Sequence, residues 1–318
     1  MRTFKHPLRD ECDLRVCDTD RVHHNSSLLI FVALLPLAIM ALSYWPVMVG
    51  LFNSWQNNDD YSAGQLVPLI ALFLFWRERK LFRECPLMPC WTGGIALVLL
   101  AETVRTYGLM SRAHPSIEQY AIVLMIPGLI LLVAGWRLFR SVLWILLFLL
   151  LMVPLPGRVH NLISGPLQTM ATTGSVFLLE AFGVRVSQQG NVIMLNETTP
   201  MAVAEACSGL RMLTAFVIVA AFMAYMVKRS RLKKAILLLS SIPVAVMCNI
   251  VRLCVTAVLF ILASSELAEK FFHEFAGLVM MPVAVLLMFA ELWLLDKIIV
   301  PEPNLQNRKA KAAGISAT

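Results

Sequence analysis

Stretches of about 20 apolar residues recur along this chain, and they restrict it to one class of fold. Of the 318 residues, 58% are hydrophobic, and the mean hydropathy is +0.73. Soluble domains are only about half apolar. The sequence therefore predicts an all-α, polytopic integral membrane bundle of about eight transmembrane helices. We place them at residues 28–52, 62–76, 92–110, 119–136, 141–155, 207–227, 235–262 and 272–296.

The segments between these spans are too short to build a core of their own, which predicts one integral domain at 28–297. Residues 1–27 are too long and too charged for a cleavable signal peptide, so we expect a retained first span behind a cytoplasmic tail. Residues 298–318 form the second cytoplasmic tail in this prediction.

Lysine and arginine set the expected orientation, because cytoplasmic loops carry an excess of them. With both termini inside, 20 of the 27 basic residues fall on the inner side and 4 on the outer side, and 3 lie within spans. The net charge of +7 is therefore explained by orientation and lipid head groups, and nucleic acid is not an expected partner. The prediction is a multi-pass protein of the inner (plasma) membrane.

Inner and outer loops alternate consistently only if residues 162–182 form a helical stretch that does not cross the membrane. We expect this stretch to lie along the outer surface or to dip into the membrane and return. Short alternating apolar runs follow it, with Val184 and Val186 on one side of Gly190-Asn191 and residues 192–195 on the other. This pattern predicts a small β-hairpin in the outer loop, just ahead of Cys207.

Cys207 is the one cysteine of seven that this topology places on the outer side. A free cysteine is often a small buried hydrophobe. Here Ser208 and Gly209 give backbone access, and Arg211 lies one helical turn further on. A cation and a helix N-terminus lower a thiol pKa, so we interpret Cys207 as a reactive thiol with no disulfide partner.

Two further polar positions fall at a similar depth in the predicted membrane. Arg252 lies within a span with Asn249 on the same helical face. Either these two are a helix-packing pair or they serve a site. His273 opens the last span, with Gly277 one turn on, and is either an interfacial histidine or a proton carrier.

Together these groups favour thiol acyl transfer. Cys207 would attack a carbonyl, Arg252 would stabilise the oxyanion with its donor fork, and His273 would carry protons. Glu102 and Arg105 are spaced i,i+3 within a span and are interpreted as an internal salt bridge. No organic cofactor is implied, and a metal site at Cys12, Cys17, His23 and His24 is a minor alternative to an unstructured tail.

The chain resembles the exosortase/archaeosortase family of polytopic membrane transpeptidases over residues 28–297. Where the family typically has a histidine before Gly64, this chain has Ala63. The likeness is carried by Trp55, by Asp60-Tyr61-Ser62-Ala63-Gly64-Gln65-Leu66-Val67-Pro68 with Trp76, by Ala206-Cys207-Ser208-Gly209-Leu210-Arg211, and by Asn249-x-x-Arg252 followed by His273-x-x-x-Gly277.

The resemblance implies that Cys207, Arg252 and His273 are catalytic, with Arg211, Asn249, Ser208, Gly209, Gly277 and Tyr61 in supporting positions. It also implies exported protein substrates with a C-terminal sorting signal: a motif of the Pro-Glu-Pro type, a transmembrane helix and a basic cluster. The product would pass to a cell-envelope acceptor, and bacterial members are often linked with exopolysaccharide production. Water as acceptor would give proteolysis instead.

Two hypotheses that assign the chain to other functional classes stay open. A transporter would use Glu102, Arg105 and Arg252 as a polar pathway through the membrane. A non-catalytic subunit of a polysaccharide-export complex would tolerate substitution of Cys207, Arg252 and His273 together.

Overall fold

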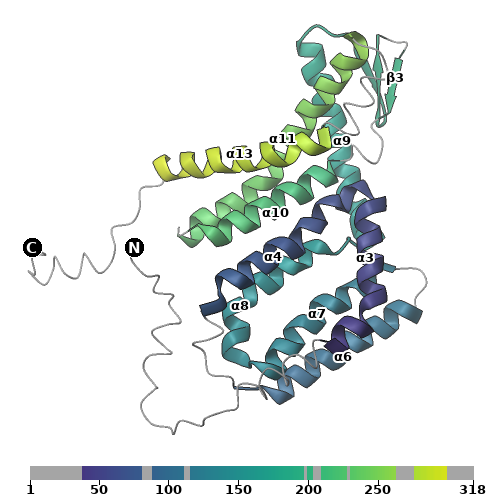
Figure 1. Cartoon of the computed structure of the whole chain (residues 1–318). Helices are drawn as coiled ribbons and strands as arrows, with labels where there is room; N and C mark the ends of the chain where they lie inside the picture. The colour runs from purple at the N-terminus through teal and green to yellow at the C-terminus, as the bar shows by residue number, and fades with distance from the viewer. Residues whose placement is uncertain are drawn as a thin grey trace, which may run out of the picture.

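The computed structural model describes residues 38–80, 88–110, 115–196, 199–202, 209–227, 230–262 and 276–298. Almost all of this part of the chain is helical, which confirms the predicted class (Figure 1). The first two apolar segments become α3 (Trp45–Asn57) and α4 (Leu66–Arg77), joined by the 3-10 helix η1 (Asp59–Gln65). The next helices are α6 (Trp91–Met110), α7 (Pro115–Val133), α8 (Trp136–Phe148) and the 3-10 helix η2 (Leu149–Met152).

The described part of the second half of the chain supplies four more helices and a small sheet. They are α9 (Gly157–Ala181), β1 (Val186–Gln189), β2 (Val192–Leu195), β3 (Thr199–Ala202), α10 (Leu210–Met226), α11 (Arg231–Leu262) and α13 (Ala276–Ile298). Within the described residues, three helices are long and apolar enough to cross a membrane: α6, Ser116–Val133 of α7, and α11. A further span is possible if the bent pair Trp136–Met152 and Gly157–Ala181 counts as one. The chain is thus a multi-pass helical membrane protein, and the total of eight spans stays a prediction.

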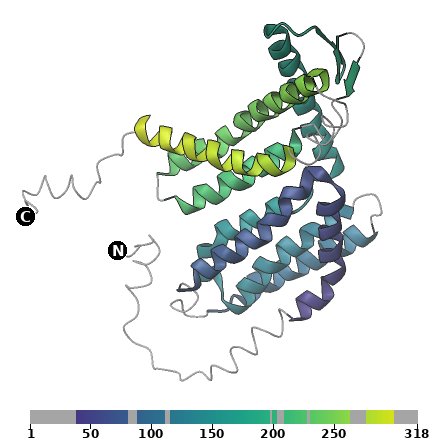
Figure 2. The same ribbon diagram turned by 45° about the horizontal axis from the view of Figure 1, so that its top comes forward.

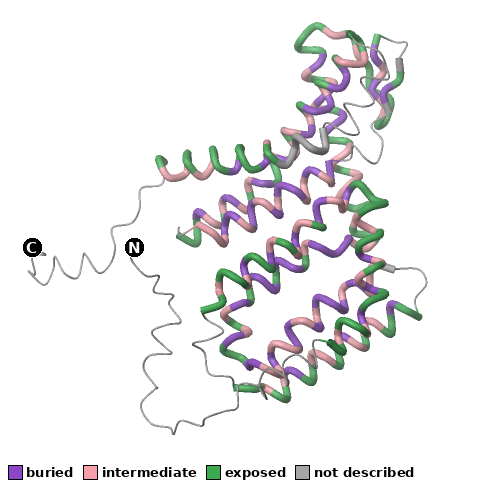
Figure 3. Tube along the Cα trace, in the orientation of Figure 1, coloured by how far each residue is buried: buried purple, intermediate pink, exposed green. Residues whose placement is uncertain are grey.

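The exposed surface of the helix bundle is rich in apolar side chains, as expected of a surface that faces lipid. Large apolar side chains such as Leu72, Leu99, Met110 and Phe289 are exposed on the helices, and the exposed positions follow the outward faces in Figure 3. A soluble protein rarely leaves so much contiguous apolar surface in water. In a bilayer these side chains face acyl chains instead, and the helices satisfy their own backbone hydrogen bonds.

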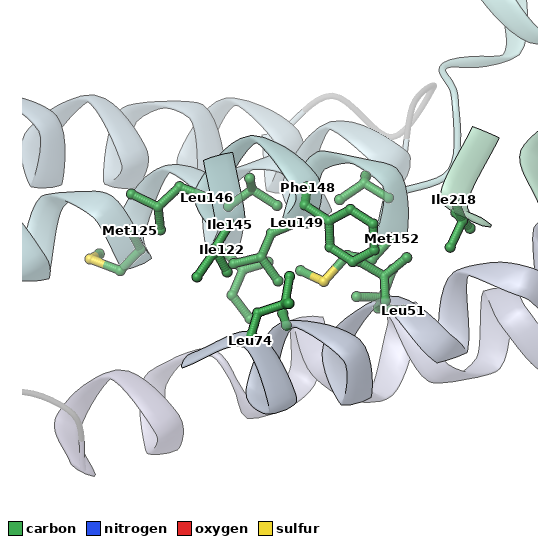
Figure 4. Close-up of a cluster of buried hydrophobic side chains, with 14 of the residues drawn as sticks. Leu51, Leu74, Ile122, Met125, Ile145, Leu146, Phe148, Leu149, Met152 and Ile218 are labelled. Carbon is green, nitrogen blue, oxygen red and sulfur yellow. The ribbon is translucent and has the colours of Figure 1, made fainter. Parts of the chain in front are cut away.

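Three apolar cores hold the helices together. The largest joins α3, α4, α6, α7, α8, η2 and α10, with Leu51, Leu74, Ile145 and Ile218 among its buried members (Figure 4). A second core packs α10, α11 and α13 through Phe216, Ala245 and Met288. α10 belongs to both cores and so links the two halves of the molecule, together with Leu238 of α11 (Figures 1 and 2).

The third core packs the sheet against α9 and the C-terminal half of α11. Ile193, Leu195 and Met201 from the sheet pack with Leu179 of α9 and Leu253 of α11. The strands are antiparallel in the order β1-β2-β3, and β1 pairs with β2 around Gly190, whose φ is +63°. The predicted hairpin is confirmed, with β3 as an additional strand.

α9 occupies most of the stretch that was expected not to cross. It leaves η2 at an 80° bend and then packs along α11, where Ser175 donates a hydrogen bond to the Ile250 carbonyl at 3.4 Å. A bend of this size is compatible with a helix that dips in or lies at the surface, and the depth of α9 in the bilayer stays a prediction.

Candidate functional site

The backbone at the entry of α10 touches α11 at Asn249. Gly209 is the N-cap of α10 and has φ +81°, a left-handed conformation that favours glycine. A Cβ placed at Gly209 would lie 2.8 Å from Nδ2 of Asn249, so no larger residue fits without displacing that amide. The predicted supporting residues Gly209 and Asn249 are therefore brought into direct contact.

The Asn249 face of α11 points into the protein. Asn249 is 1% exposed and Arg252, one turn further along, is 5% exposed. A charged side chain buried among membrane helices is costly unless other groups pair with it or hydrogen-bond it, and such residues mark functional positions in membrane helices. The predicted guanidinium is thus held within the helix bundle, at the turn of α11 that follows the Gly209 contact.

The three helices associated with the predicted catalytic residues pack against one another. α10, α11 and α13 share the core of Phe216, Ala245 and Met288. Gly277 lies in the first turn of α13. Cys207, Ser208 and His273 lie outside the described residues, so their predicted roles stay predictions.

Arg211 has a partner that the sequence did not reveal. Its Nη1 lies 3.3 Å from Oδ2 of Asp59, in an ion pair between the first turn of α10 and η1. Thr214, three residues on, donates a hydrogen bond from Oγ1 to the Asp60 carbonyl at 3.2 Å. The predicted cation beside Cys207 therefore shares its charge with a carboxylate, and η1 is bound to the start of α10 at two points.

A carboxylate–imidazole pair lies next to this contact. Asp60 is 4% exposed, and its Oδ2 accepts a hydrogen bond from Nε2 of His160 at 3.0 Å. His160 comes from the first turn of α9, and its ring lies 5.8 Å from that of Tyr61. The sequence analysis did not select His160, because a single histidine in a predicted outer segment carries no spacing signal. Only the fold brings it to Asp60, 100 residues away in the chain.

Tyr61 is oriented by the loop before α9, where its hydroxyl donates to the Leu155 carbonyl at 3.4 Å. Burial, and then the nearby Asp60 charge, raise the pKa of Tyr61 to about 12. The phenol therefore stays protonated at neutral pH and acts as a hydrogen-bond donor.

Glu102 and Arg105 form the predicted internal salt bridge, with 3.5 Å between Oε2 and Nη1. The same groups tie α6 to the segment before α3, because Tyr44 donates to Glu102 at 3.0 Å and Arg105 donates to Ser43. These contacts account for both charges as part of helix packing.

No group of three or more potential metal ligands occurs among the described residues, and Cys12, Cys17, His23 and His24 lie outside them. Within the described part, Cys90, Cys248 and Cys254 are free.

One comparison with known proteins identifies a relationship. The family model for the transmembrane exosortases (Exosortase_EpsH) matches residues 55–290. A search of the curated proteins and a search of the solved structures each found no match. The matched range runs from Trp55, ahead of η1, to a position near the end of α13 and includes every residue of the candidate site.

Proposed function

Because the chain belongs to the transmembrane exosortase family, we propose that it is a membrane-embedded cysteine transpeptidase that cleaves a C-terminal sorting signal on exported proteins. The signal would combine a Pro-Glu-Pro type motif, a transmembrane helix and a basic cluster. Cys207 would form a thioester with the cleaved product and pass it to a cell-envelope acceptor. The membrane lipids around the bundle would bring the substrate helix in laterally.

The contact between Gly209 and Asn249 carries this proposal. Gly209 is two residues after Cys207, and Asn249 is three residues before Arg252. Because consecutive Cα atoms are about 3.8 Å apart, two residues span at most about 7 Å. The contact therefore supports a nucleophile within reach of the Arg252 turn of α11.

The register between α11 and α13 supports a role for His273. Lys233 of α11 donates from Nζ to Asp296 of α13 at 2.9 Å. Arg252 lies 19 residues after Lys233, and Gly277 lies 19 residues before Asp296. With equal rise along two antiparallel helices, Gly277 would lie near the level of Arg252. His273, four residues before Gly277, would then lie about one turn beyond this level.

In the proposed reaction, the Cys207 thiolate attacks the scissile carbonyl, and Arg252 hydrogen-bonds the developing oxyanion. His273 gives a proton to the leaving amine as the C–N bond breaks. The acceptor then loses its proton to His273, attacks the thioester, and releases the thiolate as the C–S bond breaks. Water as acceptor gives hydrolysis, and an envelope nucleophile gives transfer.

The test is alkylation with a membrane-impermeant thiol reagent in right-side-out vesicles, read as a mass shift on the Cys207 peptide. Wild type, Cys207→Ser, Arg252→Ala and His273→Ala are compared, with Cys90 as the internal control thiol. We expect fast outer-side labelling of Cys207 that slows in the Arg252 and His273 variants. A Cys207 that labels only from the cytoplasmic side, or resists permeant reagents, contradicts the proposal.

A further inference from the structure

The carboxylate–imidazole pair between η1 and α9 has no part in the reaction described above. We propose that His160 is a positioning residue: its hydrogen bond to Asp60 fixes η1, and η1 fixes the first turn of α10, which follows the nucleophile. This inference rests on the proposed function and adds a residue to its site. It predicts that His160 acts as a hydrogen-bond donor and not as an acid or base.

The carboxylate of Asp60 lies in the interior of the protein. Asp60 has a side chain only 6% exposed, and its carboxylate bonds the His160 imidazole at 3.0 Å. An ionised carboxylate removed from water requires compensating donors. Loss of the imidazole would therefore remove one of the groups that compensate this buried charge and weaken the hold on the turn that carries it.

The η1 turn has little freedom while the Asp60–His160 pair is intact. Asn58 accepts a hydrogen bond from the Asp60 N–H at 3.0 Å, and Tyr61 is held by the Leu155 carbonyl. The His160 ring, 18% exposed, also lies against Tyr61 and has Nδ1 3.3 Å from Oδ1 of Asn161. Contacts on both sides of Asp60 thus place its carbonyl and the neighbouring Asp59 carboxylate.

Two contacts connect η1 to α10. The Asp60 carbonyl accepts from Thr214, and Asp59 pairs with Arg211, so both contacts fall in the first turn and a half of the helix. The Gly209 backbone ahead of them is packed on Asn249. Displacing η1 would move Arg211 and the helix N-terminus, the two features that lower the pKa of a nearby thiol.

The experiment measures the pH midpoint of Cys207 alkylation in the full chain in vesicles for wild type, His160→Ala and His160→Gln. A glutamine amide can donate to Asp60 but does not titrate. We expect the midpoint to rise by about one pH unit in His160→Ala, because the cation and helix N-terminus no longer favour the thiolate. His160→Gln should restore most of the wild-type midpoint.

Glu102→Gln is the matched control, because it alters an ion pair within α6, away from η1. It should lower stability without moving the midpoint. An unchanged midpoint in His160→Ala overturns the inference alone, and so does a glutamine variant as impaired as the alanine variant, which would indicate acid–base chemistry. A wild-type Cys207 that titrates like an ordinary free thiol overturns the proposed function, and this inference with it.

Discussion

Replacing Gly209 with alanine tests the contact that places the entry of α10 on α11. Gly209 has φ +81°, and an L-residue in this conformation costs roughly 1–2 kcal/mol. The new Cβ would also lie 2.8 Å from the Asn249 amide nitrogen, and overpacking of this kind costs about 1–3 kcal/mol. We therefore expect Gly209→Ala to lower the free energy of unfolding by about 3 kcal/mol.

The assay is reversible unfolding in mixed micelles, combined with Cys207 alkylation to follow the site. Gly165→Ala is the matched control, because Gly165 lies within α9 and a Cβ there meets nothing within 4 Å. Alanine at an open helical position should be neutral or stabilising by up to about 1 kcal/mol.

A double-mutant cycle separates the two costs. Asn249→Ala removes the amide that the new Cβ would strike, so the double variant should recover about 1–3 kcal/mol of steric cost and keep the backbone cost. The reasoning is refuted if Gly209→Ala is as stable as Gly165→Ala, or if the cycle shows no coupling between Gly209 and Asn249.

Three further predictions address other contacts. Arg252→Lys should reduce the rate of thioester formation by about 10²-fold or more, because an ammonium cannot reproduce the planar donor fork, and single-turnover kinetics measure this. Glu102→Gln should lower the free energy of unfolding by about 1 kcal/mol, because the Tyr44 hydroxyl then donates to a neutral amide. The alkylation rate of Cys207 should stay at the wild-type value. A loss of that reactivity would favour the transporter hypothesis. Asp296→Asn should destabilise the α11–α13 contact by weakening the Lys233 pair, which thermal unfolding detects, and an unchanged melting temperature would argue against the register used for Gly277.

Much of the fold was predictable because membrane helices are specified locally. Apolar runs of sufficient length must form helices in a bilayer, whatever their neighbours, since the backbone has no other way to satisfy its hydrogen bonds there. The expected spans at 92–110 and 235–262 therefore match α6 and α11 closely. The hairpin was predictable for the same local reason, from alternation on both sides of Gly190. β3 was missed because Thr199-Pro200-Met201-Ala202 shows no such pattern.

For the candidate site, the sequence predicted the individual residues but not the contacts between elements. The sequence by itself singled out Cys207, Arg252 and His273, because ionisable or nucleophilic groups stand out against an apolar background. It also indicated the Glu102–Arg105 pair, whose partners lie one turn apart on a single helix. Spacing along one element is a property of the sequence, so both conclusions were available without a structure.

Contacts between elements were decided only by the tertiary structure. Packing alone brings Gly209 onto Asn249, gives Arg211 to Asp59, and moves His160 across 100 residues to the buried carboxylate of Asp60. Helical periodicity says which face of a helix is apolar, but not which neighbour covers that face or in what register. For this reason the sequence determined that the chain is a multi-pass helical membrane protein with a candidate thiol, whereas only the packing of η1, α9, α10 and α11 decided which described side chains meet at the start of α10.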